Sequence, residues 1–222
     1  TTVQTEARTG DPWTNDKKRK MFDHSRSIEH TALYSYKATE SSDPVTGKPK
    51  RFTKGLRGFI PATNTHTFSA AVSTTDLLDK VQPAYDSFSL PGSGDTRVGF
   101  TGYEGLKQIN LIVKADADVQ MQFGDVIRMW GMDFRELIMP WGRLLLKAHP
   151  LLSRHSLFRT SLYVMDFAAF KWAPLRGRDT KPKDDVQADD EDVRRGFVMT
   201  EGGWFCDGGG LTLAIVDNIS ST

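Results

Sequence analysis

The sequence predicts an α+β fold on the basis of three observations. First, apolar residues recur at spacings of three and four across residues 11–40, which is the period of a helix. Second, residues 55–114 alternate between short strand-like and helix-like patterns. Third, strand-like runs separated by turn signals dominate from residue 125 onward. A helix, a mixed region and then mostly strands is an order typical of the α+β class.

The composition limits the possible functions. The 222 residues are enough to bury a core in one large domain or two small ones. No apolar run approaches the roughly 20 residues that span a bilayer, so we expect no membrane partner. Because the net charge is +1, any nucleic-acid contact must come from a local patch. The single cysteine, Cys206, excludes an internal disulfide and fits a reducing compartment.

The first expected element is one long helix over residues 11–40. Asp11 suits the N-cap, and Pro12 suits the first helical position. Such a helix would be on the order of 40 Å long, well beyond the roughly three turns common in compact domains. The expected buried stripe consists of Met21, Phe22, Ile28, Ala32, Leu33 and Tyr36.

The middle of the chain is expected to hold short elements of both kinds. A polar turn is predicted at residues 43–54, a short strand at 55–61, and a loop or edge strand at 62–73. A helix is predicted to begin at Ser73 or Thr74, with Asp76 in its first turn and a weak point at Pro83. A turn at 91–95, a strand at 97–100 and a helix at 102–114 follow.

The second half is expected to be mostly strands. A strand at 125–131 precedes a hairpin of residues 134–139 and 143–148, because Pro140 and Gly142 match a tight-turn signature. Further strands are predicted at 162–166, 196–201 and 211–218, with a charged, solvated loop at 180–195. The three glycines at 208–210 precede a strand, so we expect a tight turn there and no phosphate loop.

An acidic cluster in the charged loop is the one candidate for metal chemistry. Hard cations need clustered oxygen ligands, but the spacing here is not that of an EF-hand loop. Cations flank the cluster, which favours a self-compensating loop over a metal-dependent hydrolase, the alternative function. We find no catalytic or cofactor motif and predict neither an enzyme nor a cofactor. The cluster consists of Asp184, Asp185, Asp189, Asp190, Glu191 and Asp192.

A basic run lies early on the long helix and consists of Lys17, Lys18, Arg19 and Lys20. Four adjacent positions span a full turn, so they cannot all face one line of phosphates. A solvated helical face is one interpretation, and sequence-independent contact with nucleic-acid phosphates is the other. No interleaved aromatic residues are visible in the sequence that would favour base stacking.

The order of several segments resembles the major capsid protein of tailed bacteriophages, a fold shared with encapsulins and herpesvirus shells. The segments are the long helix ending in Ile28-Glu29-His30-Thr31-Ala32-Leu33-Tyr34, the passage at 47–60, the run Tyr163-Val164-Met165-Asp166, the passage at 171–179, and the passage at 196–201 with its closing strand. Together they span nearly the whole chain.

The resemblance implies a structural subunit that forms pentamers and hexamers of an icosahedral virion shell around double-stranded DNA, assembled in the host cytoplasm. It implies a peripheral domain with a β-sheet and a spine helix that faces the DNA, together with an α/β axial domain. The implied partners are other copies of the chain, packaged DNA and possible portal, scaffolding or decoration proteins. Another phage structural part, a tail or connector protein, is a further alternative.

The resemblance also implies domain boundaries and contact residues. Residues 1–10 would end an extended loop whose main part, with the N-terminal arm, is absent from this chain. Residues 11–62 and 125–160 would form the peripheral domain, and residues 63–124 and 161–222 the axial domain. The basic run at residues 17–20 would face DNA. The expected inter-subunit ion pairs involve Arg176, Arg178, Asp179, Arg194 and Arg195.

Overall fold

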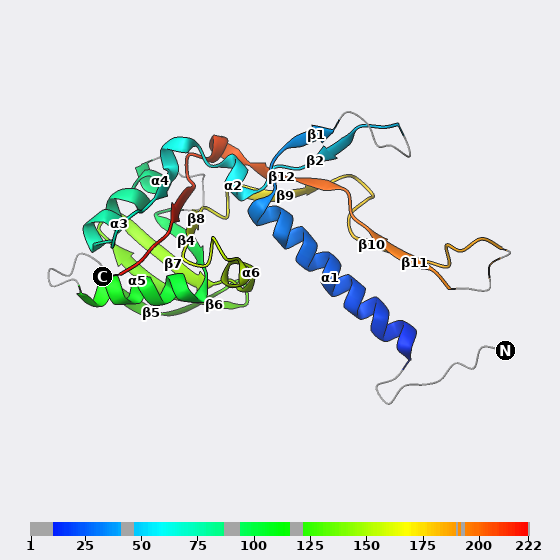
Figure 1. The fold of residues 1–222 in the computed structure, drawn as a ribbon, viewed down its shortest axis with the longest axis horizontal. Helices are drawn as coiled ribbons and strands as arrows, with labels where there is room; N and C mark the ends of the chain where they lie inside the picture. The colour runs from blue at the N-terminus through cyan, green and yellow to red at the C-terminus, as the bar shows by residue number, and fades with distance from the viewer. Residues whose placement is uncertain are drawn as a thin grey trace. The chain divides into compact units, whose positions relative to one another are not determined.

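The computed structural model describes residues 11–40, 47–86, 94–115, 122–189, 191 and 194–221. It contains both helices and strands, which confirms the predicted α+β class (Figure 1). The chain divides into two compact units. Unit 1 comprises Thr1–Gly55 and Trp172–Trp204, and unit 2 comprises Leu56–Lys171 and Phe205–Thr222. Two paired strands, β9 (Phe170–Pro174) and β12 (Gly202–Cys206), carry the chain from one unit into the other.

Unit 1 is built on the long helix α1 (Pro12–Tyr34). Asp11 caps it by accepting hydrogen bonds from the backbone N–H groups of Trp13 and Thr14, and Pro12 occupies the first turn, as predicted. Hydrogen bonds from the side chain and backbone of Thr14 lower the pKa of Asp11 below its ordinary value. The carboxylate therefore stays charged at the positive end of the helix dipole.

The helix ends six residues earlier than predicted. Ser35 is already extended, and its carbonyl accepts a hydrogen bond of 2.7 Å from the backbone N–H of Gly55. Beyond it, β1 (Ala38–Glu40) pairs antiparallel with β2 (Lys50–Phe52). Pairing with a distant segment overrides the local helical pattern here. Tyr36, expected in the buried stripe, therefore lies outside the helix and is 62% exposed.

Residues 181–184 of the charged loop predicted at 180–195 form one strand of a β-ribbon. Strand β10 (Lys181–Asp184) pairs antiparallel with β11 (Gly196–Met199), from Lys181 opposite Met199 to Asp184 opposite Gly196. All four residues of β10 are exposed and none is apolar except Pro182, so the sequence carries no alternating pattern there. Only the segment between these two strands corresponds to the predicted loop.

Unit 2 holds a seven-stranded mixed sheet in the order β3-β13-β8-β4-β7-β6-β5. Its strands are β3 (Thr65–Thr67), β4 (Thr96–Thr101), β5 (Gln122–Met129), β6 (Met132–Met139), β7 (Gly142–Ala148), β8 (Leu162–Met165) and β13 (Ala214–Asp217). The predicted hairpin is confirmed, because β6 and β7 pair antiparallel across Pro140 and Trp141. Strands β8 and β13 are buried along their whole length, as expected for the near-continuous apolar runs of central strands.

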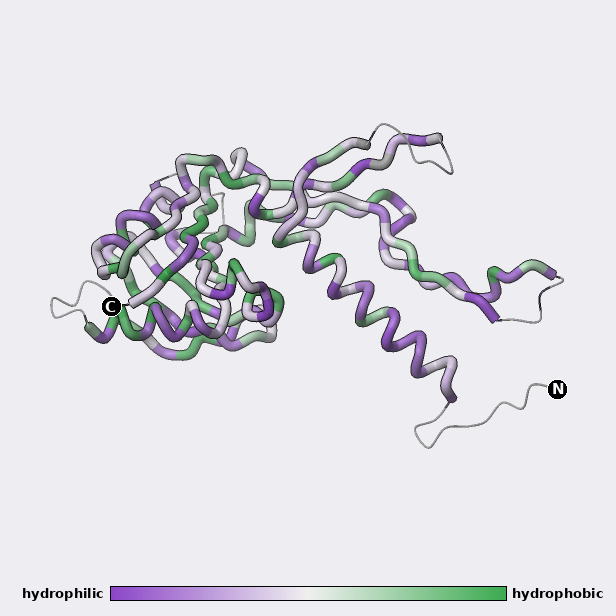
Figure 2. The backbone as a smooth tube through the Cα atoms, in the orientation of Figure 1, coloured by the Kyte–Doolittle hydropathy of each residue, from purple (hydrophilic) through white to green (hydrophobic). Residues whose placement is uncertain are grey.

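The helices of unit 2 are α2 (Leu56–Phe59), α3 (Thr74–Val81), α4 (Pro83–Asp86), α5 (Tyr103–Ala115) and α6 (Pro150–Arg154), with 3₁₀ turns at Ala62–Asn64 and Asp207–Gly210. The core lies between the sheet and helices α3, α4 and α5. It includes Leu77, Ile109, Leu144, Val164 and Val216, each at most 2% exposed. Figure 2 shows the hydrophobic colouring gathered on these strands, whereas much of α1 is hydrophilic.

The strand predicted at 55–61 is wrong, because α2 is a single helical turn. Leu56 and Ile60 are both buried, and their spacing of four places them on one face of that turn. Such a short apolar run does not distinguish a strand from a helix. The helices expected near Ser73 and over 102–114 are confirmed as α3 and α5.

The domain boundaries expected from the sequence differ from the two compact units. Residues 125–160 were expected beside the long helix, but β7 pairs in parallel with β4, so this hairpin belongs to the sheet of unit 2. Conversely, Trp172–Trp204 belongs to unit 1, where it supplies the ribbon. The sequence did not reveal these long-range strand pairings.

None of the helices in the described part of the chain is both long and apolar enough to cross a membrane.

Candidate functional site

A hollow of unit 1 lies where the ribbon of β10 and β11 runs beside the N-terminal half of α1. Two polar contacts hold the ribbon to the helix. The Nζ of Lys17 lies 2.5 Å from the Oδ2 of Asp184, and the Nε2 of His24 lies 2.7 Å from the Oγ1 of Thr200. A third contact places the guanidinium of Arg194 4.8 Å from the ring centre of Trp13, a cation–π geometry.

Between these contacts lies a groove of about 720 Å³ that joins apolar and cationic side chains. Met21, Val186 and Phe197 line its apolar part, while Lys20 and Arg195 add positive charge. Such a lining suits binding by burial and charge.

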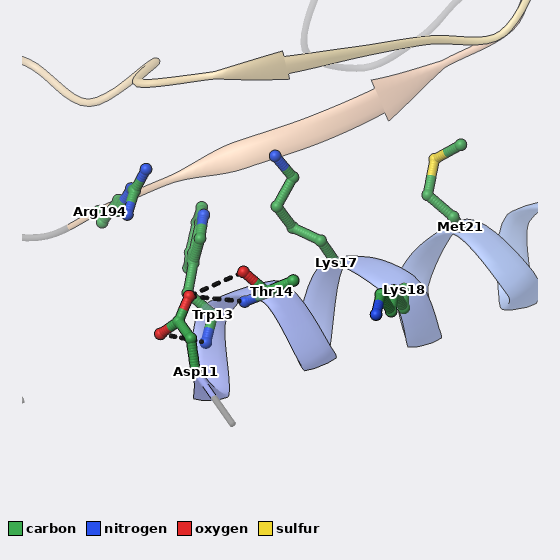
Figure 3. A pocket seen from close by; sticks show the side chains of 7 residues that line it. All are labelled: Asp11, Trp13, Thr14, Lys17, Lys18, Met21 and Arg194. Carbon is green, nitrogen blue, oxygen red and sulfur yellow. Dashed lines mark hydrogen bonds between the residues drawn. The ribbon is translucent and has the colours of Figure 1, made fainter. Parts of the chain in front are cut away.

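A smaller hollow of about 500 Å³ lies at the N-terminal end of α1 (Figure 3). In Figure 3 the side chain of Lys17 extends toward the ribbon, and Trp13 stands beside Arg194. The indole Nε1 of Trp13 is buried without a hydrogen-bond partner in the described structure. The Asp11 carboxylate accepts hydrogen bonds from the backbone N–H and the hydroxyl of Thr14.

The four side chains of the basic run point in different directions, as expected for adjacent positions on a helix. Lys17 and Lys20 line the groove, and Lys17 is already paired with Asp184. Lys18 and Arg19 are exposed, and neither makes an ion pair with any described residue. The four cations therefore do not form one surface, and only some are available for an external partner.

Three members of the acidic cluster form ion pairs within the chain. Asp184 pairs with Lys17, Asp185 with Arg194 at 3.5 Å, and Glu191 with Arg195 at 3.1 Å. In the described part of the chain, no three His, Cys, Asp or Glu side chains gather in a way that could hold a metal ion. Asp190 and Asp192 lie outside the described residues.

Most of the expected inter-subunit residues have partners inside the subunit. Arg178 lies 2.5 Å from Glu201, and the Oδ1 of Asp179 accepts a hydrogen bond of 2.8 Å from the backbone N–H of Thr180. Arg194 and Arg195 make the ion pairs described above. These ion pairs are about half exposed, so each contributes little to the stability of the subunit.

Arg176 differs from the other four residues. It lies in a turn closed by a 2.8 Å hydrogen bond from the backbone N–H of Arg178 to the carbonyl of Leu175. Gly177, with φ of 79°, supplies the left-handed conformation that a type II turn requires at its third position. The turn thus presents Arg176 at an exposed corner, and no described residue forms an ion pair with it.

Sequence reasoning placed Met21 and Ile28 in the covered stripe of the helix but missed Trp13, Lys17 and His24, which contact the ribbon or its neighbouring loop. All five positions recur at spacings of three and four and are partly covered. This stripe could have been found from its period, but its mixed polarity hid it. Phe22, by contrast, was expected to be buried and is 67% exposed.

Comparison with solved structures shows which known fold the chain shares. Among 22 matching chains is the holo-SrpI encapsulin complex from Synechococcus elongatus PCC 7942. It matches with a TM-score of 0.55 and 7% sequence identity, over 96% of this chain and 68% of that chain. At this identity the likeness shows the fold alone, which is that of an encapsulin-like capsid shell. No curated protein sequence matches the chain.

The family model of the SU10 major capsid protein matches residues 1–208, and the chain belongs to this family. The resemblance predicted from the order of segments is thereby confirmed. Family membership gives the chain the role of a structural capsid subunit in the virion, and it agrees with the expectation of no enzymatic activity.

Proposed function

We propose that this protein assembles into pentamers and hexamers that close into an icosahedral shell around double-stranded DNA, and that assembly occurs in the host cytoplasm. The observation that carries the proposal is the family match over residues 1–208. The encapsulin-like fold supports it, because shell proteins act by self-association.

Within that shell, unit 1 would be the peripheral domain and unit 2 the axial domain. The assignment is supported by α1, whose 23 residues make it about 35 Å long, as a spine helix requires. The seven-stranded sheet with helices α3, α4 and α5 forms a separate core in unit 2, as expected for an α/β axial domain.

The sparse packing of α1 supports contacts with other subunits. Only Leu33 of its 23 residues is buried in the described structure. Helices of this kind are stabilised mainly by tertiary packing of an apolar face, and a single buried residue provides little of it. Neighbouring subunits would supply the missing packing. Arg176, at its exposed corner, is the best placed of the expected residues for an inter-subunit ion pair.

DNA contact is proposed for the basic run on α1, through phosphate interactions that do not depend on sequence. Portal, scaffolding or decoration proteins are further possible partners of a shell with this role.

The test is assembly of the purified chain. We expect light scattering after size-exclusion chromatography to detect large species, and negative-stain electron microscopy to show capsomers or closed shells. Raising protein and salt concentrations should promote assembly if apolar burial drives it. Monodisperse monomers or small oligomers under all these conditions would refute the proposal, and small closed rings alone would favour a connector protein.

A further inference from the structure

The two-residue turn between β5 and β6 holds a bulky residue in a conformation that such residues rarely adopt. Trp130 and Gly131 join the paired residues Met129 and Met132, and their φ angles are both positive, 49° and 73°. Two positive φ angles are typical of a type I′ hairpin turn, in which asparagine or aspartate followed by glycine is strongly preferred. A tryptophan is strained there, because its Cβ crowds the following carbonyl oxygen.

Trp130 is exceptional among the residues with positive φ. The other two non-glycine residues with positive φ in the described ranges are Asp185 and Asn218. Aspartate and asparagine tolerate the left-handed region, whereas a bulky residue there is an outlier. Strained residues of this kind cluster at functional sites, so the conformation of Trp130 points to a role beyond the turn itself.

Packing inside the subunit accounts for only part of the Trp130 side chain. Its ring makes T-shaped contacts with Phe167, at a centroid distance of 4.9 Å, and with Phe134, at 6.1 Å. Phe134 is almost completely buried, so these contacts fix the indole against the core. Trp130 itself remains 58% exposed. The subunit therefore holds a large aromatic side chain in place at its surface and leaves more than half of it uncovered.

Charged residues flank the turn. Arg128 and Asp133 lie opposite each other on β5 and β6, and the Nε of Arg128 is 4.0 Å from the Oδ1 of Asp133. Lys147 on the neighbouring strand β7 donates a hydrogen bond of 3.1 Å to the carbonyl of Asp133. An aromatic anchor with charged residues at its edge is common in protein interfaces, and tryptophan is among the residues most enriched at their energetic centres.

We propose that Trp130 anchors a contact between two copies of the chain, in which the indole enters the groove between α1 and the β10–β11 ribbon of a neighbouring copy. The inference rests on the proposed function, since it names a contact through which subunits of the shell would associate. Trp130 belongs to unit 2 and the groove to unit 1, so the contact joins different surfaces of the two copies. Each copy can then bind two neighbours, and a ring forms where the rotation between copies closes.

The groove offers the chemistry that an indole requires. Met21 and Val186 supply apolar surface, and contacts between a methionine sulfur and an aromatic ring are favourable. Lys20 supplies a cation, and tryptophan has the best aromatic face for a cation–π contact. The guanidinium of Arg194 makes such a contact with Trp13 at the same groove. The volume of about 720 Å³ lies within the range of about 300–1,000 Å³ typical of binding pockets.

The mixed charge of the groove favours an uncharged anchor. Asp16 and Asp23 line it together with Lys20 and Arg195, so neither an anion nor a cation is selected. An aromatic ring packs on the apolar lining without opposing either charge. One indole buries at most about 250 Å², less than the about 800 Å² on each side of a standard interface. Trp130 is therefore the anchor of a larger contact.

The first experiment measures assembly of the full chain with Trp130→Asn. Asparagine suits the positive φ of this turn, so the dissociated subunit should keep the circular dichroism spectrum of the wild type. The protein concentration that gives half-maximal assembly, followed by light scattering, should rise about tenfold or more, as expected for the loss of an interface hot spot. A wild-type concentration would overturn the inference.

A second variant tests the groove without changing the turn. Val186 is 42% exposed, so Val186→Asp should leave the fold intact and weaken assembly. Combined with Trp130→Asn it should weaken assembly no further, because both variants remove the same contact. Fully additive effects would overturn the pairing of the two sites.

The matched control is Leu157→Asn, which removes an apolar side chain that is 73% exposed in unit 2. It should assemble as the wild type does. A loss of assembly equal to that of Trp130→Asn would mean that exposed apolar surface in general drives association, and would overturn the specific role of Trp130.

Disulfide cross-linking separates this inference from the proposed function. Copies carrying Asp133→Cys, which keep Trp130, are mixed with copies carrying Val186→Cys and oxidised; the native Cys206 is buried. Mass spectrometry should detect a peptide that links positions 133 and 186, which only two different copies can form in this mixture. If shells form and the link is absent, the inference alone fails. If the link forms and no shells appear, the contact stands and the proposed function fails.

Discussion

Gly210 shows how a single residue can be fixed by both backbone conformation and space. Its φ of 83° lies in the left-handed region, and a Cβ placed on it would lie 2.3 Å from the carbonyl oxygen of Phe59. We expect Gly210→Ala to reduce the free energy of unfolding by roughly 2–4 kcal/mol, combining left-handed strain with overpacking. Urea denaturation of the dissociated subunit measures the reduction.

Gly209 provides the matched control. Its φ of 64° is similar, but nothing lies within 4 Å of a Cβ placed there. Gly209→Ala should therefore cost only the conformational part, about 1 kcal/mol. If both variants are destabilised equally, the proximity of Phe59 does not constrain Gly210.

The basic run shows which features of individual residues can be predicted from the sequence and which cannot. Helical geometry alone predicts that four adjacent cations cannot share one face, and the structure agrees. Which cation is neutralised could not be predicted, because Asp184 lies 167 positions away from Lys17. The same limit applied to Phe22: the period of a helix identifies its faces, but only the tertiary structure determines which face is covered.

At the scale of elements, the start of α3 is held by a reciprocal capping box. The Ser73 side chain accepts a hydrogen bond from the backbone N–H of Asp76, and the Asp76 carboxylate accepts one from the backbone N–H of Ser73. The pKa of Asp76 is lowered below its ordinary value of 3.8, mainly by a hydrogen bond from the Ser73 side chain and to a lesser extent by one from the Ser73 backbone. Ser73→Ala should therefore cost about 1 kcal/mol of unfolding free energy, measured by urea denaturation.

The capping box also predicts a pH dependence. A carboxyl whose folded pKa is lowered contributes stability above its unfolded pKa, near 3.8, and this contribution disappears as the pH falls through the lower folded value. Asp76→Asn should show a smaller decrease in stability than the wild type between about pH 6 and pH 3, in urea titrations. Parallel curves for the two proteins would mean that Asp76 does not contribute through its charge.

The predicted elements succeeded where local signals agreed with long-range packing. The cap of α1, the start of α3 and the turn between β6 and β7 each depend on residues close in sequence, and all three are confirmed. The predictions failed at the C-terminal end of α1, at α2 and at β10. At α2 the apolar run is too short to distinguish a strand from a helix. At the end of α1 and at β10 the outcome depends on a partner distant in sequence, such as Gly55 for the end of α1. A local pattern does not contain that information.

For the whole molecule, the periodicity of the sequence predicted the fold class, and the order of its segments predicted the capsid family. The division into two units could not be predicted from the sequence. Unit 1 combines the N-terminal segment with Trp172–Trp204, and unit 2 joins Leu56–Lys171 to the C-terminal strand. Such discontinuous units depend on pairings between distant strands, for example β13 with β3 and β8.

The role of Arg176 is testable only in the assembled molecule. It is exposed at the corner of its turn and has no ion pair with a described residue, so Arg176→Glu should change the stability of the isolated subunit by less than about 0.5 kcal/mol. If Arg176 meets a carboxylate of the neighbouring subunit, the same change places two like charges together and should sharply reduce the yield of shells. Light scattering measures the yield, and urea denaturation measures the stability.

Arg178→Ala is the informative control, because the Arg178 charge already pairs with Glu201 inside the subunit. The pair is about half exposed, so its removal should cost the subunit only about 0.2–1 kcal/mol and affect shell yield less than Arg176→Glu does. Raised salt should narrow the difference in yield between the wild type and Arg176→Glu, because screening weakens both the attraction and the repulsion. Wild-type shell yield from Arg176→Glu at low salt would remove Arg176 from the subunit contacts and leave the packing of α1 as the main candidate for self-association.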